Sequence, residues 1–236
     1  FKDMFLVVIQ LGAILAVAVM YFHKLNPFSP SKSARQKQAT WALWIKIVIA
    51  CIPAAVLGLL FDDWMEAHLY NAYVVAATLI IYGVLFIVLE NSSITANPSI
   101  TKVGHVSTKT ALFIGLFQLL SLVPGTSRSG STILGAMVLG CSRGVAAEFS
   151  FFLGIPVMFG ASFLKLVKFF VKGNVLTGPQ IFYTILGMAI AFGVSVYSIQ
   201  FLMGYVRRHD FKFFGYYRII LGVVVLAYFG ITALAA

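Results

Sequence analysis

The residues best suited to chemistry lie in one short polar stretch, residues 124–132, which reads PGTSRSGST. Its proline lacks an N–H group and tends to end a preceding helix, and its two glycines allow backbone conformations closed to other residues. Successive N–H groups in such a turn can form a concave anion-binding nest, to which the hydroxyl groups add donors. The candidate anion-binding residues are Gly125, Thr126, Ser127, Arg128, Ser129, Gly130, Ser131 and Thr132.

Arg128 carries the only charge in this stretch. Its planar guanidinium can donate two parallel hydrogen bonds to phosphate oxygens. Ser131 or Thr132 could cap the helix that follows, and the N-terminus of that helix adds the positive end of its dipole. An arginine at bilayer depth costs roughly 2.5–3.5 kcal/mol, which a bound anion would offset. The alternative is a connecting loop whose arginine extends to the lipid headgroups.

The stretch does not match the common phosphate motifs. A P-loop needs Gly-Lys-Ser/Thr, which does not occur in the chain. A cysteine phosphatase needs a cysteine within the loop, and a membrane histidine phosphatase needs a histidine shortly after it, but 124–132 has no cysteine and 130–140 no histidine. The four histidines are scattered among predicted helix ends and loops: His23, His68, His105 and His209.

Glu148 is the only acidic residue in the apolar run 144–164. Carboxylates inside membranes usually face a partner or a wet cavity, so Glu148 could pair with Arg128, hold a divalent cation or act as an acid or base. A glutamate near the positive end of a helix dipole is the alternative. We take Arg128, Ser127 and Glu148 as the candidate catalytic residues.

Four further residues could support the site. Gln10 and Gln118 are uncharged polar groups within apolar runs, where they either reach the site or form hydrogen bonds between helices. Tyr217 and Arg218 open the last apolar run, where anchoring at the membrane interface is the alternative to a role in the site.

The elements that must position these residues are membrane helices. Of the 236 residues, 61% are hydrophobic and only 10% charged, whereas soluble domains carry about a quarter charged residues. The apolar runs approach the roughly 20 residues that a helix needs to cross a bilayer, and they are continuous rather than alternating, which excludes a strand barrel. The sequence predicts an all-α polytopic membrane protein, with spans at 4–22, 42–61, 69–89, 145–168, 181–204 and 214–235.

Residues 111–141 differ from these spans, because neither apolar half is long enough to cross a bilayer. They form either one broken helix or a re-entrant hairpin, and both require a polar cavity or surrounding protein. Counting loop charges by the positive-inside rule favours the hairpin. The loops at 23–46 and 90–110 are then cytoplasmic, and 62–68, with Asp62, Asp63 and Glu66, lies outside. Arg143, Arg207, Arg208 and Lys212 also stay inside, whereas Lys165, Lys168 and Lys172 fall outside, against the rule.

The net charge of +10 comes from basic residues spread between the apolar runs, so it indicates topology and lipid headgroups rather than a nucleic-acid partner. The two cysteines, Cys51 and Cys141, form neither a disulfide framework nor a metal motif.

Four segments together resemble a known family. They are PGTSRSG at 124–130, EFSF at 148–151, VIQLGAILA at 8–16, and the Tyr217-Arg218 pair. In this order they are similar to the undecaprenyl pyrophosphate phosphatases of bacteria, the bacitracin-resistance family, and the match is collinear along the whole chain. The resemblance implies a single membrane domain of six helices and two re-entrant hairpins, one of them 111–141, arranged as an inverted repeat.

The resemblance also implies an activity: removal of the terminal phosphate from undecaprenyl pyrophosphate, which recycles the lipid carrier of cell-wall precursors. It implies a divalent cation (Mg or Ca), a polyprenyl diphosphate in a bacterial plasma membrane, and a site on the outer side. A homodimer is compatible with the sequence, which does not give the oligomeric state. Carried over by position, Ser127, Arg128, Ser129 and Gly130 belong to the diphosphate site, with Glu148 nearby.

One part of the family pattern has no match. A Glu-rich segment and a Pro-Val-Ser-Ser-Thr-Gly-His loop would precede Phe1, so we expect the chain to be N-terminally incomplete and the principal carboxylates to lie upstream. Such a piece could bind without turnover. The rival function is a transporter or flippase of a lipid phosphate, since broken helices and inverted repeats are typical of transporters.

Overall fold

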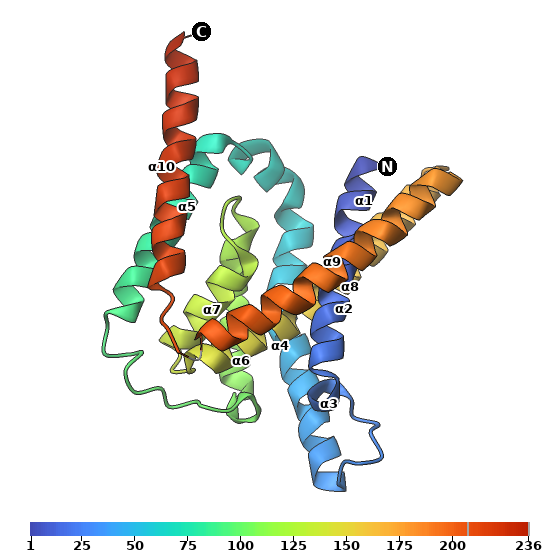
Figure 1. Ribbon diagram of the computed structural model, residues 1–236, viewed down its shortest axis with the longest axis vertical. Coiled ribbons are helices and arrows are strands. Elements are labelled where there is room, and N and C mark those ends of the chain that lie inside the picture. The colour runs from blue at the N-terminus through green and yellow to red at the C-terminus, as the bar shows by residue number, and fades with distance from the viewer. Residues whose placement is uncertain (207, 236) are drawn as a thin grey trace. The chain divides into compact units, whose positions relative to one another are not determined.

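The computed structural model describes residues 1–206 and 208–235 (Figure 1), and every regular element in them is helical. Arg207 and the side chains of Asp62, Asp63 and Glu66, on which part of the topology prediction depends, lie outside the described residues. The α-helices are α1 Lys2–Val8, α2 Gln10–Met20, α3 Phe22–Leu25, α4 Ala34–Leu69, α5 Ala72–Glu90, α6 Thr108–Leu119, α7 Arg128–Val138, α8 Arg143–Val171, α9 Gly178–Val206 and α10 Lys212–Ala235, and the 3-10 helices are η1 Val103–His105 and η2 Leu120–Leu122.

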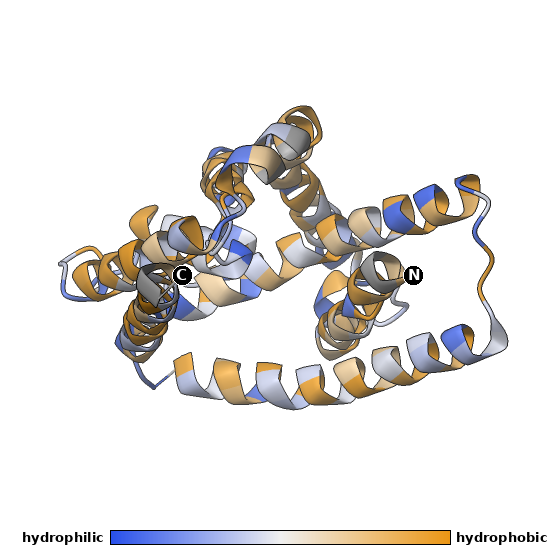
Figure 2. Cartoon of the chain, turned by 90° about the horizontal axis from the view of Figure 1, so that it is seen from above, coloured by the Kyte–Doolittle hydropathy of each residue, from blue (hydrophilic) through white to orange (hydrophobic). Residues whose placement is uncertain are grey.

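Within the described residues, five helices are long and apolar enough to cross a bilayer: α4, α5, α8, α9 and α10. Their most apolar windows have a mean hydropathy between 1.7 and 2.6, and only 6% of that window in α9 is buried. Helices that are apolar on all sides and unburied need a hydrophobic solvent, so the prediction of a helical membrane protein is confirmed. Figure 2 shows apolar residues along the helices, with hydrophilic residues mostly near helix ends and connections.

The helix boundaries differ from the prediction in two places. The predicted span 4–22 is divided at Ile9 into α1 and α2. The predicted loop 62–68 is instead the last part of α4, which also begins before the predicted start at 42. Charged residues were taken as ends of spans, but Asp, Glu, Lys and Arg are compatible with a helix that continues beyond the hydrocarbon.

The chain forms two compact units, which are described separately. The first unit comprises Phe1–Ile45 and Phe151–Tyr205. In it α2 packs tightly against α9, because a Cβ atom on Gly12 would lie only 2.1 Å from the carbonyl oxygen of Met188. The Ser162 hydroxyl of α8 donates to the carbonyl of Val7 in α1 at 3.2 Å. Small and hydroxyl-bearing residues at such crossings are typical of membrane helix packing.

The second unit comprises Lys46–Ser150 and Val206–Ala236 and contains the polar stretch. Its longest contact joins α5 to α10, which lie side by side in Figure 1. Gly83 and Gly215 permit this approach, because a Cβ atom on either one would lie within 2.8 Å of the carbonyl oxygen of the other. The short helices α6 and α7 pack against each other within the same unit.

Candidate anion-binding site

The two ends of the segment 100–142 are hydrogen-bonded to each other. The N–H of Ile100 donates to the Gly140 carbonyl and the N–H of Ser142 donates to the Ile100 carbonyl, both at 2.9 Å. Between these two points α6 runs out and α7 runs back. Paired ends are what a hairpin has and a spanning helix lacks. The depth of 111–141 in the bilayer stays a prediction.

The turn at the tip of this hairpin is fixed from α5. The Thr78 hydroxyl donates to the Pro124 carbonyl at 2.8 Å. Gly125 follows with a φ of +82°, and a Cβ atom there would lie 2.2 Å from Thr78 Oγ1 and 2.6 Å from the Val75 carbonyl oxygen. Both the left-handed conformation and the lack of space require glycine at this position.

Arg218 of α10 holds the same turn from another direction. Its Nη2 donates to the Gly125 carbonyl at 2.8 Å. Its Nη1 lies against the start of α7, since a Cβ atom on Gly130 would be 3.2 Å from it. The guanidinium also lies over the Tyr82 ring, with Cζ 5.7 Å from the centroid. Arg218 therefore contacts both the turn and the start of α7, as a supporting residue would, and its role in binding stays a prediction.

Ser127 caps α7. Its Oγ accepts a hydrogen bond from the Gly130 N–H at 3.2 Å and lies 3.1 Å from the Ser129 hydroxyl. The N-terminus of α7, which is the positive end of the helix dipole, therefore lies beside the side chains of Ser127 and Ser129.

The prediction that Ser131 or Thr132 caps this helix is wrong. The helix begins at Arg128, and both hydroxyls donate to the Arg128 carbonyl at 3.0 Å from inside the first turns. Thr132 also lies 2.6 Å from the Ser150 hydroxyl of α8. Both residues are at most 1% exposed, so they support α7 rather than face a ligand.

Arg128 is half-buried as the first residue of α7. Its charge interacts with the thiol of Cys51 on α4, so both residues belong to this region of the unit. A guanidinium at the N-terminus of a helix is unfavourable for the dipole by itself. An anion between the guanidinium and the N–H groups would turn that repulsion into attraction to both.

Several buried polar atoms around the turn have no hydrogen-bond partner among the described residues. They are both amide atoms of Gln118, the Thr126 hydroxyl and the Nε of Arg218. Gln118 is 1% exposed and Thr126 is 8% exposed. Leaving a buried polar group unpaired costs about 1–3 kcal/mol, so such groups indicate a ligand or bound water. Thr126 belongs to the turn, with its hydroxyl near that of Tyr82, whereas Arg218 belongs to α10 and contacts the turn.

Glu148 lies on α8 two residues before Ser150 and is 9% exposed. It follows the first turn of α8, which contains no acidic residue. Because the dipole effect fades beyond the first turn, the helix-dipole explanation does not account for Glu148. The hydrogen bond between Ser150 and Thr132 links this segment of α8 to α7.

Sequence reasoning did not single out Glu90, the last residue of α5. Its carboxylate is fully buried and accepts hydrogen bonds from Arg143 Nε and from the Phe211 N–H, both at 2.9 Å. These bonds join the ends of three helices, α5, α8 and α10. The sequence signal that could have identified it is an acidic residue directly after the apolar run 69–89. Glu90 is structural, because its partners satisfy it.

The other predicted supporting residues do not join the turn. Tyr217 is 59% exposed, although its neighbour Arg218 is buried, so anchoring in the bilayer fits it better. Gln10 is exposed and belongs to the first unit. Across residues 1–206 and 208–235, no three His, Cys, Asp or Glu side chains gather in a way that could hold a metal ion.

The chain resembles proteins of one family throughout. Residues 1–224 match the family model described as bacitracin resistance protein BacA. A protein named undecaprenyl-diphosphatase from Streptococcus thermophilus is 58% identical over 228 residues, which cover 97% of this chain and 79% of that protein. Proteins of the same name from Limosilactobacillus fermentum and Enterococcus faecalis are 57% and 54% identical, over 99% and 97% of this chain and 84% and 83% of theirs.

Proposed function

The chain belongs to the bacitracin resistance protein family, and we propose that it hydrolyses undecaprenyl diphosphate to undecaprenyl phosphate and inorganic phosphate. It is a membrane phosphatase that recycles the lipid carrier of cell-wall precursors. One observation carries the assignment of the site. The turn at 124–130 is held by hydrogen bonds from Thr78 and Arg218, and it leads into the N-terminus of α7, beside the Ser127 and Ser129 hydroxyls, with Arg128 as the first helical residue.

The residues of the turn bind the diphosphate and stabilise the charge that develops during transfer. The Arg128 fork and N–H groups of the first turn of α7 contact phosphoryl oxygens, and the Ser129 hydroxyl adds a donor. In phosphoryl transfer, positioning and charge stabilisation provide most of the catalysis. Arg218 keeps the turn in shape through the Gly125 carbonyl, and its unpaired Nε offers a further donor.

The attacking oxygen belongs either to a water molecule or to Ser127. Attack on the terminal phosphorus breaks the phosphoanhydride bond, and undecaprenyl phosphate leaves. A serine nucleophile would form a phosphoserine that water then hydrolyses. Replacing Ser127 by alanine separates these routes. Loss of the helix cap alone costs about 1 kcal/mol of stability, whereas loss of the nucleophile abolishes turnover in the folded protein.

The decisive experiment measures phosphate release from undecaprenyl diphosphate by the detergent-solubilised protein. Without a second compartment, a transporter or flippase releases no phosphate, whereas a phosphatase does. Arg218→Lys is the companion variant, because a lysine keeps the charge but loses the fork that reaches both Gly125 and α7. Absence of phosphate release by the wild-type protein would refute the proposal.

We further propose a divalent cation (Mg or Ca), an outer-facing site in the plasma membrane and a homodimer. The cation would add charge stabilisation at the diphosphate. Within the described chain Glu148 is the one candidate ligand near α7. Chelation with EDTA tests the cation, labelling by an impermeant reagent on intact cells tests the side, and light scattering tests the dimer.

A further inference from the structure

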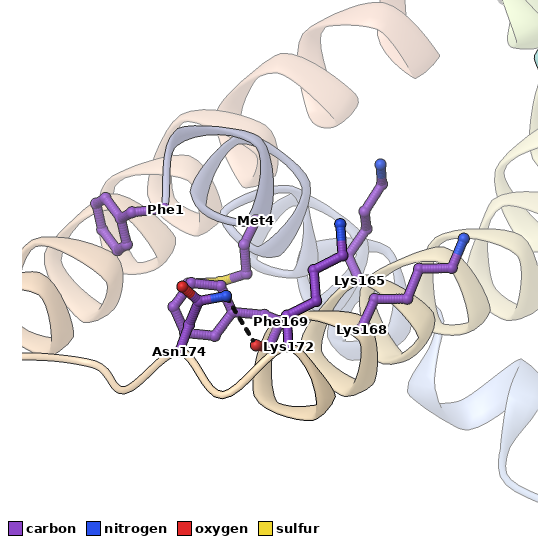
Figure 3. A pocket seen from close by; sticks show the side chains of 7 residues that line it. All are labelled: Phe1, Met4, Lys165, Lys168, Phe169, Lys172 and Asn174. Atoms are coloured by element: carbon purple, nitrogen blue, oxygen red, sulfur yellow. Dashed lines mark hydrogen bonds between the residues drawn. The ribbon is translucent and has the colours of Figure 1, made fainter.

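Three lysines near the C-terminal end of α8 share one side of the helix. Lys165, Lys168 and Lys172 are spaced at i, i+3 and i+7, which places them within one narrow face. All three side chains are exposed. Figure 3 shows them extending to the same side of α8. Charge counting had already set these lysines apart, because the predicted topology puts them outside, against the positive-inside rule.

The three lysines line a pocket of about 220 Å³ within the first unit. Phe1 and Met4 of the α1 segment and Phe169 of α8 provide its apolar wall. Asn174 follows α8 and satisfies a carbonyl of its last turn, because its Nδ2 donates to the Phe169 carbonyl at 3.1 Å, as drawn in Figure 3. Three cations and an apolar wall therefore surround one hollow.

The charges of this pocket are not balanced by described residues. The ammonium groups of Lys165, Lys168 and Lys172 form no hydrogen bond or ion pair within the described part of the chain. Like charges three and four residues apart on a helix destabilise it by about as much as opposite charges stabilise it. The helix dipole explains only Lys168, the one basic residue in the last turn. Among the described residues, these ammonium groups are thus available to an anionic ligand.

The position along α8 identifies the class of anion. Helix α8 ends at Val171 and has 29 residues, about 44 Å, which exceeds the roughly 30 Å of hydrocarbon, so its last turns can lie among the headgroups. The neighbouring side chains Phe163 and Phe170 are 66% and 52% exposed. The lysines cover about 10 Å along the axis, which is comparable to the headgroup region beyond the hydrocarbon. We propose that this pocket binds the headgroup of an anionic phospholipid, with lysines around its phosphate and the Phe and Met side chains against the first part of its acyl chains.

The test titrates delipidated protein in detergent with short-chain phosphatidylglycerol and counts bound lipid by native mass spectrometry. The variant is K165Q/K168Q/K172Q. The matched control is K37Q/K102Q/K109Q, which removes three positive charges at other sites. Each lysine near an anionic surface contributes roughly a fivefold change in affinity, so we expect the pocket variant to lose the site and the control to keep it.

Three results would overturn the proposal. They are equal binding by the wild type and the pocket variant, equal loss in the control, and equal binding of phosphatidylcholine of the same chain length. Competition by millimolar inorganic phosphate would instead assign the pocket to free phosphate. If the glutamine variant does not fold, the variant K165R/K168R/K172R replaces it. This variant retains the positive charge, so it must still bind the lipid, and loss of binding would contradict the proposal. Phosphate release from undecaprenyl diphosphate is measured in parallel and should be unchanged.

Discussion

Replacing Gly125 by alanine tests the turn that the site depends on. The residue has a φ of +82°, which costs an L-residue roughly 1–2 kcal/mol. The added Cβ would lie 2.2 Å from Thr78 Oγ1 and 2.6 Å from the Val75 carbonyl oxygen, and overpacking of this kind costs about 1–3 kcal/mol. The backbone oxygen cannot rotate away, so the turn must move. Displacement of a catalytic group by about 1 Å lowers activity on the order of 100-fold.

The assay is phosphate release from undecaprenyl diphosphate in detergent, with thermal unfolding measured on the same samples. Gly173→Ala is the matched control, because Gly173 also has a positive φ, +75°, but nothing lies within 4 Å of its added Cβ. We expect the control to lose some stability and no activity, and Gly125→Ala to lose most of both. Near-normal turnover of folded Gly125→Ala, or an equal loss in the control, would refute the role of this turn.

Three other changes address the chemistry of the site. Arg128→Lys should lower kcat by a factor on the order of 100–1000, because an ammonium cannot replace the guanidinium fork; near-normal turnover would count against the diphosphate assignment. Glu148→Gln should weaken the response of the rate to added divalent cation, and an unchanged metal titration would make Glu148 structural. An anionic methanethiosulfonate should react with Cys51 beside Arg128 and inactivate the enzyme, and inorganic pyrophosphate should protect it. Cys141 is the internal control, because it is only 4% exposed whereas Cys51 is half-buried, so Cys141 should stay unmodified.

The helical membrane class and the polar turn could be predicted from the sequence because both depend on local patterns. Uncharged runs need no partner to be recognised as membrane helices. The Pro-Gly pair at 124–125 interrupts an apolar run, and the structure has a turn there. The cap of α7 was also a local signal, since Ser127 stands three residues before Gly130. It was missed because Gly130 looked like a break rather than part of the first turn.

The partners of the turn could not be predicted in the same way. Arg218 binds a carbonyl that is 93 residues earlier in the chain, and Thr78 binds one that is 46 residues later. Neither contact follows from periodicity or composition, because both depend on how α5 and α10 pack against the hairpin. For the same reason nothing in the sequence distinguishes Tyr217 from its neighbour Arg218, although Tyr217 is exposed and Arg218 is buried in the structure.

The buried polar groups of the described residues are of two kinds: those with hydrogen-bond partners, which stabilise the fold, and those without, which indicate a binding site. The Glu90 carboxylate receives hydrogen bonds from Arg143 and from the main chain, so removing it would leave a partner unpaired without touching the turn. Gln118, Thr126 and Arg218 are buried as deeply, yet atoms of each have no partner among the described residues. Three such groups in one compact unit lower the stability of the fold, because each unpaired buried polar group costs free energy of folding. A diphosphate with its many acceptor oxygens can satisfy the donors of Thr126 and Arg218, the two that lie in the turn and on it, and this is the reason to place the substrate there.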